Sequence, residues 1–279
     1  MFKDSKLFMG TKERIKEIAI YLRFDKIINR WSNDIKVYII SYPKSGRTWL
    51  RILFGKALSE QFHLDETLLL ETHPLTRSAK INPTLFTHDG AGFGDKNSWN
   101  ELATDKSFYR NKKVVFLVRD PKDVIVSSYF HVTKRQRRFD GSISEFIRSD
   151  IYGIKKIVTF YKIWLDNQTV PKDFLLLKYE NMHKDTSEVL RSLLSFTGVQ
   201  NVPGNTIETA VNFSDFENMR KLESSQKFSK TSMQPGDTND EESYKVRKGK
   251  VGSYLEYLSQ DDMNFINQVI EEAGHPFGY

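Results

Sequence analysis

The sequence predicts an α/β fold in which helices cover both faces of a central, mostly parallel sheet of about four or five strands. The first observation behind this prediction is that short apolar runs alternate with longer segments of helical periodicity. The second is that these runs are continuously apolar, as in strands buried on both faces. The third is length: a chain near 300 residues buries about 75% of its unfolded surface, so residues 1–279 are expected to form a single domain.

The first part of the chain is expected to hold an N-terminal helical segment, 1–35, then a strand and a helix. Apolar residues recur at helical spacing over 11–31, which predicts an amphipathic helix packed on the core, with a membrane-surface helix as the alternative. The run Lys-Val-Tyr-Ile-Ile at 36–40 predicts a buried strand. A short turn follows, and the next apolar residues predict a helix that reaches Leu58.

The alternation continues downstream. Three further runs predict strands, at 84–87, 113–118 and 173–178. Pro121 favours a helix start directly after the second of these runs. The helix after the third is expected to begin at the capping residue Asp185 and to end near Gly198.

The composition limits the class of protein. The 42 basic and 36 acidic residues leave a formal net charge of +6, which favours binding of an anionic small molecule. The acidic residues are interspersed among the basic ones, which is not typical of a dedicated nucleic-acid-binding protein. The absence of cysteine excludes a thiolate nucleophile and cysteine metal sites. No apolar run approaches the ~20 residues of a membrane helix, and no secretory signal is visible. A cytoplasmic protein without a transmembrane segment and without a required metal is expected.

The turn at 41–50, Ser-Tyr-Pro-Lys-Ser-Gly-Arg-Thr-Trp-Leu, connects the first strand to its helix. Such a turn directs several backbone N–H groups and a helix N-terminus at one place, which favours anion binding. Lys44 adds a positive charge, and the hydroxyls of Ser45 and Thr48 add donors. The turn is P-loop-like, but the nucleotide-triphosphate loop has glycine before its lysine, and Pro43 stands here instead and offers no N–H.

Residues 42–50 resemble the 5′-phosphosulfate loop of the cytosolic-type sulfotransferases, which use 3′-phosphoadenosine 5′-phosphosulfate (PAPS). Eight of the nine positions match, and the exception is Arg47, where that family has a small threonine. Lys44 matches the catalytic lysine, whose ammonium group neutralises charge on the bridging oxygen as the sulfuryl group leaves. Trp49 matches the tryptophan that stacks on adenine. The resemblance implies that this turn binds PAPS through Lys44, Ser45, Gly46, Arg47, Thr48 and Trp49.

A second segment, Arg-Asp-Pro-Lys-Asp-Val-Ile-Val-Ser, runs from Arg119 to Ser127. Arg119 follows a buried strand at the edge where parallel sheets bind ligands, and its planar fork suits a phosphate. An ion pair with Asp120 or Asp123 is the structural alternative. The segment resembles the family motif Arg-x-x-x-Asp-Val-x-x-Ser, which implies that Arg119 and Ser127 hold the 3′-phosphate of PAPS. The resemblance also suggests that Ser127 holds Lys44 aside until the acceptor arrives.

A third segment, Arg-Lys-Gly-Lys-Val-Gly, runs from Arg247 to Gly252. It resembles the family's Arg-Lys-Gly-x-x-Gly motif, which implies that Arg247, Lys248 and Gly249 close over the 3′-phosphate. The segment ends the polar stretch 223–250, which we expect to be a mobile lid that orders when the cofactor binds. A solvated basic turn is the alternative.

The family's general base is a histidine that follows a strand, and the segment Phe-Thr-His-Asp at 86–89 places His88 at this position. The threonine and the histidine match the family, whereas Asp89 replaces a leucine. An imidazole can accept a hydroxyl proton at neutral pH. His131 is the alternative base, because it follows the helix that carries Ser127.

Further contacts to the nucleotide are implied by resemblance alone. Tyr179 falls on the family's Tyr-Glu-Asp-Met position and would hydrogen-bond the adenine. Residues that align near the base and ribose, with core packing as the alternative role, are Ser214, Phe216 and Met219. The family's C-terminal dimer motif is absent, so the oligomeric state stays open.

The three segments together predict a PAPS-dependent sulfotransferase. It would transfer the sulfuryl group in line to a hydroxyl or amine of a small-molecule, lipid or carbohydrate acceptor and release adenosine 3′,5′-bisphosphate (PAP). A P-loop nucleotide kinase with Asp120 as its Walker-B-like aspartate is the alternative enzyme. The non-enzymatic alternative is a module that binds acidic polymers through the basic run 134–138, which an anionic acceptor explains equally well.

Overall fold

The computed structural model describes residues 33–225, 233 and 235–279. Its centre is a four-stranded sheet in the order β2-β1-β3-β4, formed by β1 (Val37–Ser41), β2 (Thr84–Thr87), β3 (Lys113–Val118) and β4 (Asp173–Lys178). All three pairings are parallel, and Ile39 of β1 lies opposite Phe86 of β2 and Val115 of β3. The predicted parallel sheet is therefore confirmed.

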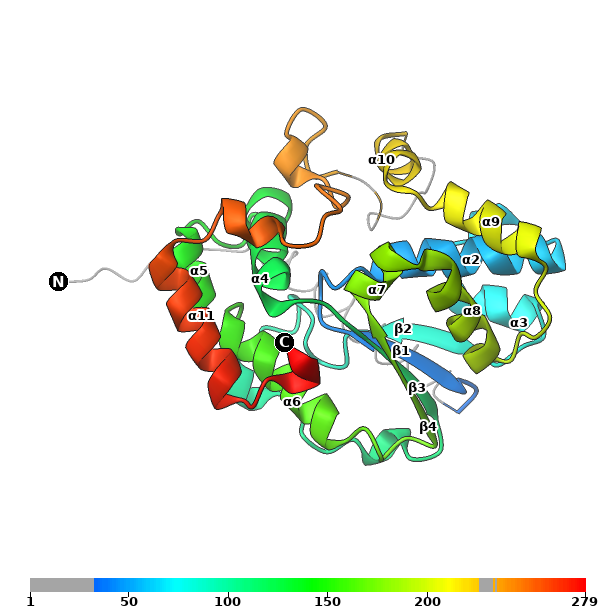
Figure 1. The fold of residues 1–279 in the computed structure, drawn as a ribbon, viewed down its shortest axis with the longest axis horizontal. Coiled ribbons are helices and arrows are strands. Elements are labelled where there is room, and N and C mark those ends of the chain that lie inside the picture. Colours follow the sequence, from blue (N-terminus) through cyan, green and yellow to red (C-terminus); the bar gives the residue numbers. More distant parts are fainter. Residues whose placement is uncertain (1–32, 226–232, 234) are drawn as a thin grey trace, which may run out of the picture.

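Helices cover both faces of this sheet. Their bounds are α2 (Arg47–Phe62), α3 (Thr72–Ser78), α4 (Pro121–Phe130), α5 (Ile143–Arg148), α6 (Ile154–Asp166), α7 (Tyr179–Lys184), α8 (Thr186–Thr197), α9 (Gly204–Phe213), α10 (Phe216–Ser224) and α11 (Gln260–Glu272). Figure 1 shows α2, α3, α8 and α9 on one side of the sheet, and α4, α5, α6 and α11 on the other. None of the helices within the described ranges is long and apolar enough to span a lipid bilayer.

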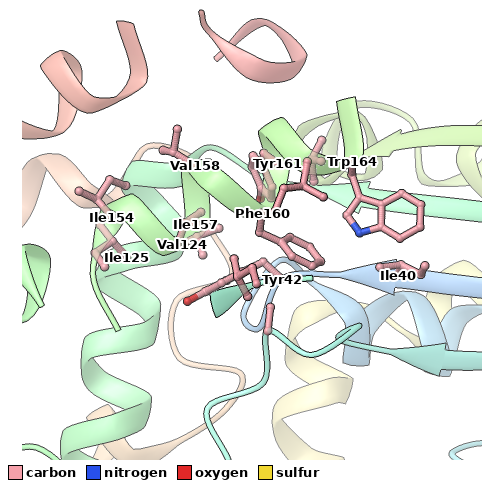
Figure 2. Close-up of a cluster of buried hydrophobic side chains, with 14 of the residues drawn as sticks. Ile40, Tyr42, Val124, Ile125, Ile154, Ile157, Val158, Phe160, Tyr161 and Trp164 are labelled. Atoms are coloured by element: carbon pink, nitrogen blue, oxygen red, sulfur yellow. The ribbon is translucent and has the colours of Figure 1, made fainter. Parts of the chain in front are cut away.

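Each strand contributes to two hydrophobic cores, because successive side chains of a strand face opposite sides of the sheet. Ile40 and Phe116 face the core that includes α4, α6 and α11. Ile39 and Val115 face the core that includes α2, α8 and α9. Figure 2 shows part of the first core, where side chains of α6 meet Ile40 and Tyr42. This double burial explains the apolar runs of the two central strands, β1 and β3.

Two of the sequence predictions fall partly or wholly outside the described residues. The helix predicted over 11–31 lies outside them, as does most of the segment 1–35. The polar segment 223–250 is described only in part, and Glu241–Ser243 forms a single 3₁₀ turn within it.

A carboxylate that is 15% exposed anchors the loop that follows β2. Asp89 Oδ1 accepts a hydrogen bond from Tyr109 Oη at 2.7 Å, and Oδ2 accepts one from Trp164 Nε1 at 3.1 Å. The ammonium group of Lys106 lies 2.7 Å from Oδ2, and its side chain is only 3% exposed. Because Trp164 belongs to α6, Asp89 joins this loop to the main core. The aspartate that replaces the family's leucine thus has a structural role.

Substitution of Asp89 by alanine should destabilise the fold. Asp89→Ala removes the acceptor of two buried donors and the counter-ion of buried Lys106. We expect the free energy of unfolding to fall by about 3–5 kcal/mol, as when one partner of a buried ion pair is lost. Urea denaturation followed by circular dichroism measures this change. Asp166→Ala, which removes the exposed pair with Lys162, is the matched control and should have little effect. Equal stability of the two variants would contradict the anchoring role.

Candidate active site

A cavity of about 740 Å3 lies where the segments after all four strands meet. Its wall includes every predicted cofactor-binding or catalytic residue except Ser45, namely Lys44, Gly46, Arg47, Thr48, Trp49, His88, Arg119, Ser127, Tyr179, Ser214, Phe216, Met219, Arg247, Lys248 and Gly249. The three motifs recognised in the sequence therefore converge on one space.

The turn after β1 has the backbone of an anion-binding loop. Lys44 and Gly46 both adopt a positive φ, at 71° and 96°, and left-handed residues help to direct successive N–H groups to one side of the chain. A Cβ atom on Gly46 would lie 2.5 Å from the ring of Tyr179, so a larger residue does not fit. Helix α2 begins directly afterwards with no acidic residue in its first turn and no side-chain cap. Its first N–H groups are thus available to an anion.

Ser45 occupies a different place from its motif neighbours. Its side chain is buried, and its Oγ lies 3.4 Å from Oη of Tyr161 on α6. The Tyr161 hydroxyl also accepts a hydrogen bond from the Arg119 N–H at 3.0 Å and donates one to the Arg119 carbonyl at 2.9 Å. One phenol thus joins the turn after β1 to the turn after β3. Sequence reasoning missed Tyr161, whose only local signal is its place in the apolar pattern of α6.

The ammonium group of Lys44 is held in surroundings that disfavour its charge. Burial lowers the pKa of Lys44 to about 7, and the nearby charge of Arg135 adds to this effect. No described residue forms a hydrogen bond or ion pair with this ammonium group. A bound anion would favour the charged form and raise the pKa again.

Arg119 faces the cavity and also forms the predicted ion pair. Its Nη2 donates to the carbonyl of Lys250 at 3.0 Å and lies 3.4 Å from the carboxylate of Asp123. Its guanidinium group lies over the ring of Tyr179, 4.2 Å from the centroid. Its Nε is buried and has no hydrogen-bond partner among the described residues. A buried N–H without an acceptor on a cavity wall is a donor for a ligand anion.

Two buried carboxylates hold the segment 245–254 at the edge of the cavity. Glu223 at the end of α10 accepts hydrogen bonds from the N–H groups of residues 245 and 246, at 2.7 and 2.9 Å. Asp123 on α4 accepts from the N–H groups of residues 252 and 254, at 2.8 and 3.1 Å. Asp123 therefore connects the second motif to the third, which explains an aspartate at this motif position.

Two basic residues of the third motif, Arg247 and Lys248, have acidic or aromatic partners. Arg247 Nη1 lies 3.1 Å from the carboxylate of Glu242 and donates to Oη of Tyr257 at 2.7 Å. Lys248 forms an ion pair with Glu256. Both basic side chains still line the cavity.

The wall between the first and third motifs is apolar and aromatic. A Cβ atom on Gly249 would lie 2.4 Å from the ring of Phe216, so the chain approaches this ring as closely as glycine allows. Phe216 is 37% exposed, whereas Met219 is buried beside Trp49. Ser214 ends α9 and is buried. Flat aromatic surfaces of this kind suit a nucleic-acid base. Met219 packs in a hydrophobic core, which was the alternative to a contact with the nucleotide.

His88 is oriented by a backbone carbonyl. Its Nδ1 lies 2.7 Å from the carbonyl oxygen of Ser41. A carbonyl oxygen only accepts hydrogen bonds, so Nδ1 carries the proton and Nε2 is left as an acceptor. Burial lowers the pKa of His88 well below its usual range, and the charge of Arg47 adds to this effect. The imidazole is therefore neutral at pH 7.

His131, the alternative base, also lines the cavity but is placed differently. Its ring packs against Phe93 at a centroid distance of 5.5 Å, and its Nδ1 is buried without a partner among the described residues. Burial and the charge of Lys44 lower the pKa of His131 as well. His88 is the histidine whose tautomer the backbone fixes.

The structure adds two cations to the cavity wall that the motifs do not include. Arg135 is the last residue of a π-helical turn, His131–Arg135, and Lys245 precedes the third motif. The basic run 134–138 is thereby divided, because residues 135 and 136 line the cavity whereas residues 134, 137 and 138 are exposed. Such single π turns are frequent at functional sites.

Asp120 is engaged in the fold. Its carboxylate accepts a hydrogen bond from the N–H of Lys122 at 2.8 Å and caps the start of α4. Burial raises the pKa of Asp120, which disfavours a free carboxylate there. This environment gives no support to a kinase-type magnesium site at Asp120.

Comparison with known proteins identifies relatives along most of the chain. Flavonol 3-sulfotransferase of Flaveria bidentis is 29% identical, with 85% of this chain and 80% of the relative covered. The 3-beta-hydroxysteroid sulfotransferase of Cavia porcellus is 25% identical, with 87% and 85% covered.

Two solved structures share the fold. A mouse sulfotransferase, SULT7A1 complexed with PAP, superposes with a TM-score of 0.59 at 21% identity, covering 86% of this chain and 84% of the other. Retinol dehydratase in a complex with retinol and PAP gives a TM-score of 0.60 at 17% identity, covering 85% and 80%. The model of the family described as sulfotransferase domain matches residues 34–278. The chain therefore belongs to the sulfotransferase domain family.

Proposed function

We propose that this chain acts as one domain that transfers the sulfuryl group of PAPS to a hydroxyl group of a small-molecule acceptor. The observation that carries the proposal is the convergence of three anion-binding segments on one cavity, beside a histidine whose Nε2 is an acceptor. The relatives named for flavonols and hydroxysteroids support a hydroxylated small molecule as the acceptor class.

The residues of the cavity suit PAPS. The turn after β1, with Lys44 and the start of α2, would bind the phosphosulfate end, since its N–H groups and its cation meet there. The buried Nε of Arg119 lacks an acceptor that a 3′-phosphate would supply. Trp49 and Phe216 would flank the adenine. PAPS, when bound, supplies the sulfuryl group that is transferred.

Two side chains would act on the reacting atoms. His88 Nε2 accepts the proton of the acceptor hydroxyl. At the same time the hydroxyl oxygen forms a bond to sulfur, and the bond from sulfur to the 5′-phosphate oxygen breaks. The Lys44 ammonium group and the loop N–H groups stabilise the negative charge that grows on that oxygen. The chemistry then depends mainly on position and electrostatics, as in phosphoryl transfer.

The identity of the nucleotide is the first property to test. We expect isothermal titration calorimetry to show PAP binding, with ATP–magnesium at least 100-fold weaker. Arg119→Ala should weaken PAP binding by about 10- to 150-fold, which corresponds to one charge-assisted hydrogen bond of about 1.5–3 kcal/mol. Arg119→Lys, which keeps the charge, is the matched control and should lose less. Binding of ATP–magnesium in preference to PAP would favour a kinase and refute the proposal.

Turnover should depend on His88 and Lys44. In an assay of sulfate transfer from PAPS, His88→Ala should lower kcat by about 10²–10⁴-fold, the usual contribution of a general base, while PAP affinity stays within a few fold. Lys44→Met should lower kcat by about 10²–10³-fold because it removes a charge that stabilises the transition state. His131→Ala tests the alternative base. A larger loss in His131→Ala than in His88→Ala would reverse the assignment.

PAP binding should be coupled to protonation of Lys44. Since its pKa is about 7 in the free protein, part of the population is neutral at pH 7, and a bound anion favours the ammonium form. Protons are then taken up on binding, and affinity should fall between pH 7 and pH 9 by up to about tenfold per pH unit. Calorimetry in two buffers of different ionisation enthalpy measures the uptake. Lys44→Arg should remove it, because arginine stays charged. An affinity independent of pH in the unmodified protein would argue against this coupling.

A further inference from the structure

The cavity carries more positive charge than the family motifs explain. Within the described part of the chain, its wall includes seven lysine or arginine side chains and one carboxylate, Asp215. That carboxylate caps α10 by accepting a hydrogen bond from the N–H of Asn218 at 2.7 Å. Four of the cations belong to the motif positions that would bind the phosphates of PAPS. The other three are cations that the family motifs do not share: Arg47, which replaces the family's threonine within the first motif, and Arg135 and Lys245 outside the motifs.

These three cations line the same cavity as His88. Arg47 and Lys245 both lie close enough to His88 for their charges to lower its pKa. Burial lowers the pKa of Lys245, and the charges of Lys44, Arg135 and Arg47 add to this effect. Arg135 is also among the charges that act on His131, which lies on the same wall. The three cations therefore share one cavity with both candidate bases, and Arg47 follows the strand whose Ser41 carbonyl orients His88.

Among the described residues, the carboxylate of Glu223 lies beside Arg135. Its Oε1 lies 3.7 Å from Nη1 of Arg135, whose side chain is 10% exposed. The Glu223 oxygens also accept the N–H groups of residues 245 and 246. Arg47 forms no hydrogen bond or ion pair with any residue that the structure describes. Like charges that share a poorly hydrated space are costly unless an anion joins them.

We propose that the acceptor is itself an anion: a small hydroxylated molecule with a carboxylate, phosphate or sulfate group that Arg47, Arg135 and Lys245 bind. Its hydroxyl group would then lie against Nε2 of His88. The planar forks of two guanidinium groups match the oxygen atoms of such groups, and Phe93 provides an apolar wall for the body of the molecule. The proposal rests on the proposed function and separates this chain from relatives named for flavonols and hydroxysteroids.

Binding of a matched pair of probes tests the anion site directly. The probes are 6-hydroxy-2-naphthoate and its methyl ester, which differ in one negative charge, titrated by calorimetry into PAP-saturated protein. We expect the acid to bind at least about tenfold more tightly than the ester, the gain typical of one charge-assisted hydrogen bond. Equal affinity for the two probes, or no binding of either at millimolar concentration, would overturn the proposal.

Variants assign the preference to the named cations. Arg47→Thr, which installs the family residue, and Arg135→Gln should each reduce the ratio of acid to ester affinity toward one. Arg137→Gln is the matched control, because Arg137 is an exposed member of the same basic run and should leave the ratio unchanged. An acid preference that survives both test variants would refute the site. A tenfold loss of PAP affinity in either test variant would refute it too, by placing that residue in the nucleotide site.

Failure of this proposal is distinguishable from failure of the proposed function. PAP binding with no acid preference would leave the sulfotransferase assignment in place and overturn the anionic acceptor alone. Conversely, the titrations are repeated without PAP. An acid preference that depends on Arg47 and Arg135 in a protein that binds no PAP would support the anion site while refuting the cofactor.

Discussion

The site depends on one buried phenol group. Oη of Tyr161 bonds both main-chain groups of Arg119 and lies beside Ser45, so it fixes the turn after β1 relative to the turn after β3. Burial raises the pKa of Tyr161, so the hydroxyl keeps its proton at physiological pH. The two turns would hold the two anionic ends of one nucleotide. The position of α6, which carries Tyr161, would therefore set the distance between the two phosphate-binding turns.

Most of the fold and the motif residues could be predicted because their signals are local. The strands are uninterrupted apolar runs, and helices begin where Asp120 or Asp185 caps them. The contacts that hold the site together are not local. Asp123 meets a segment about 130 positions away, and no pattern marks which carboxylate meets which backbone group. Arg135 lines the cavity at the end of a π-helical turn, and a basic run gives no sign of such a turn.

The charges around His88 have a further effect on its strength as a base. Burial and the cations near His88 both lower the affinity of its imidazole for a proton. A negatively charged acceptor would offset them and so raise the pKa of His88 at the moment when a proton must be accepted. On this view the acceptor contributes to the activation of its own hydroxyl group. A neutral acceptor would leave His88 a weaker base.

The third motif is tied to helix α10. Arg220 donates to the carbonyls of residues 246 and 247 at 3.1 and 3.0 Å, and Gly249 lies on the ring of Phe216, both from this helix. If release of PAP requires the third motif to move, these bonds must break or α10 must move with the motif. The lifetime of the product complex would then be set by how α10 rests on the core. Substitutions in the packing of α10 would then change the rate of product release without changing any reacting group.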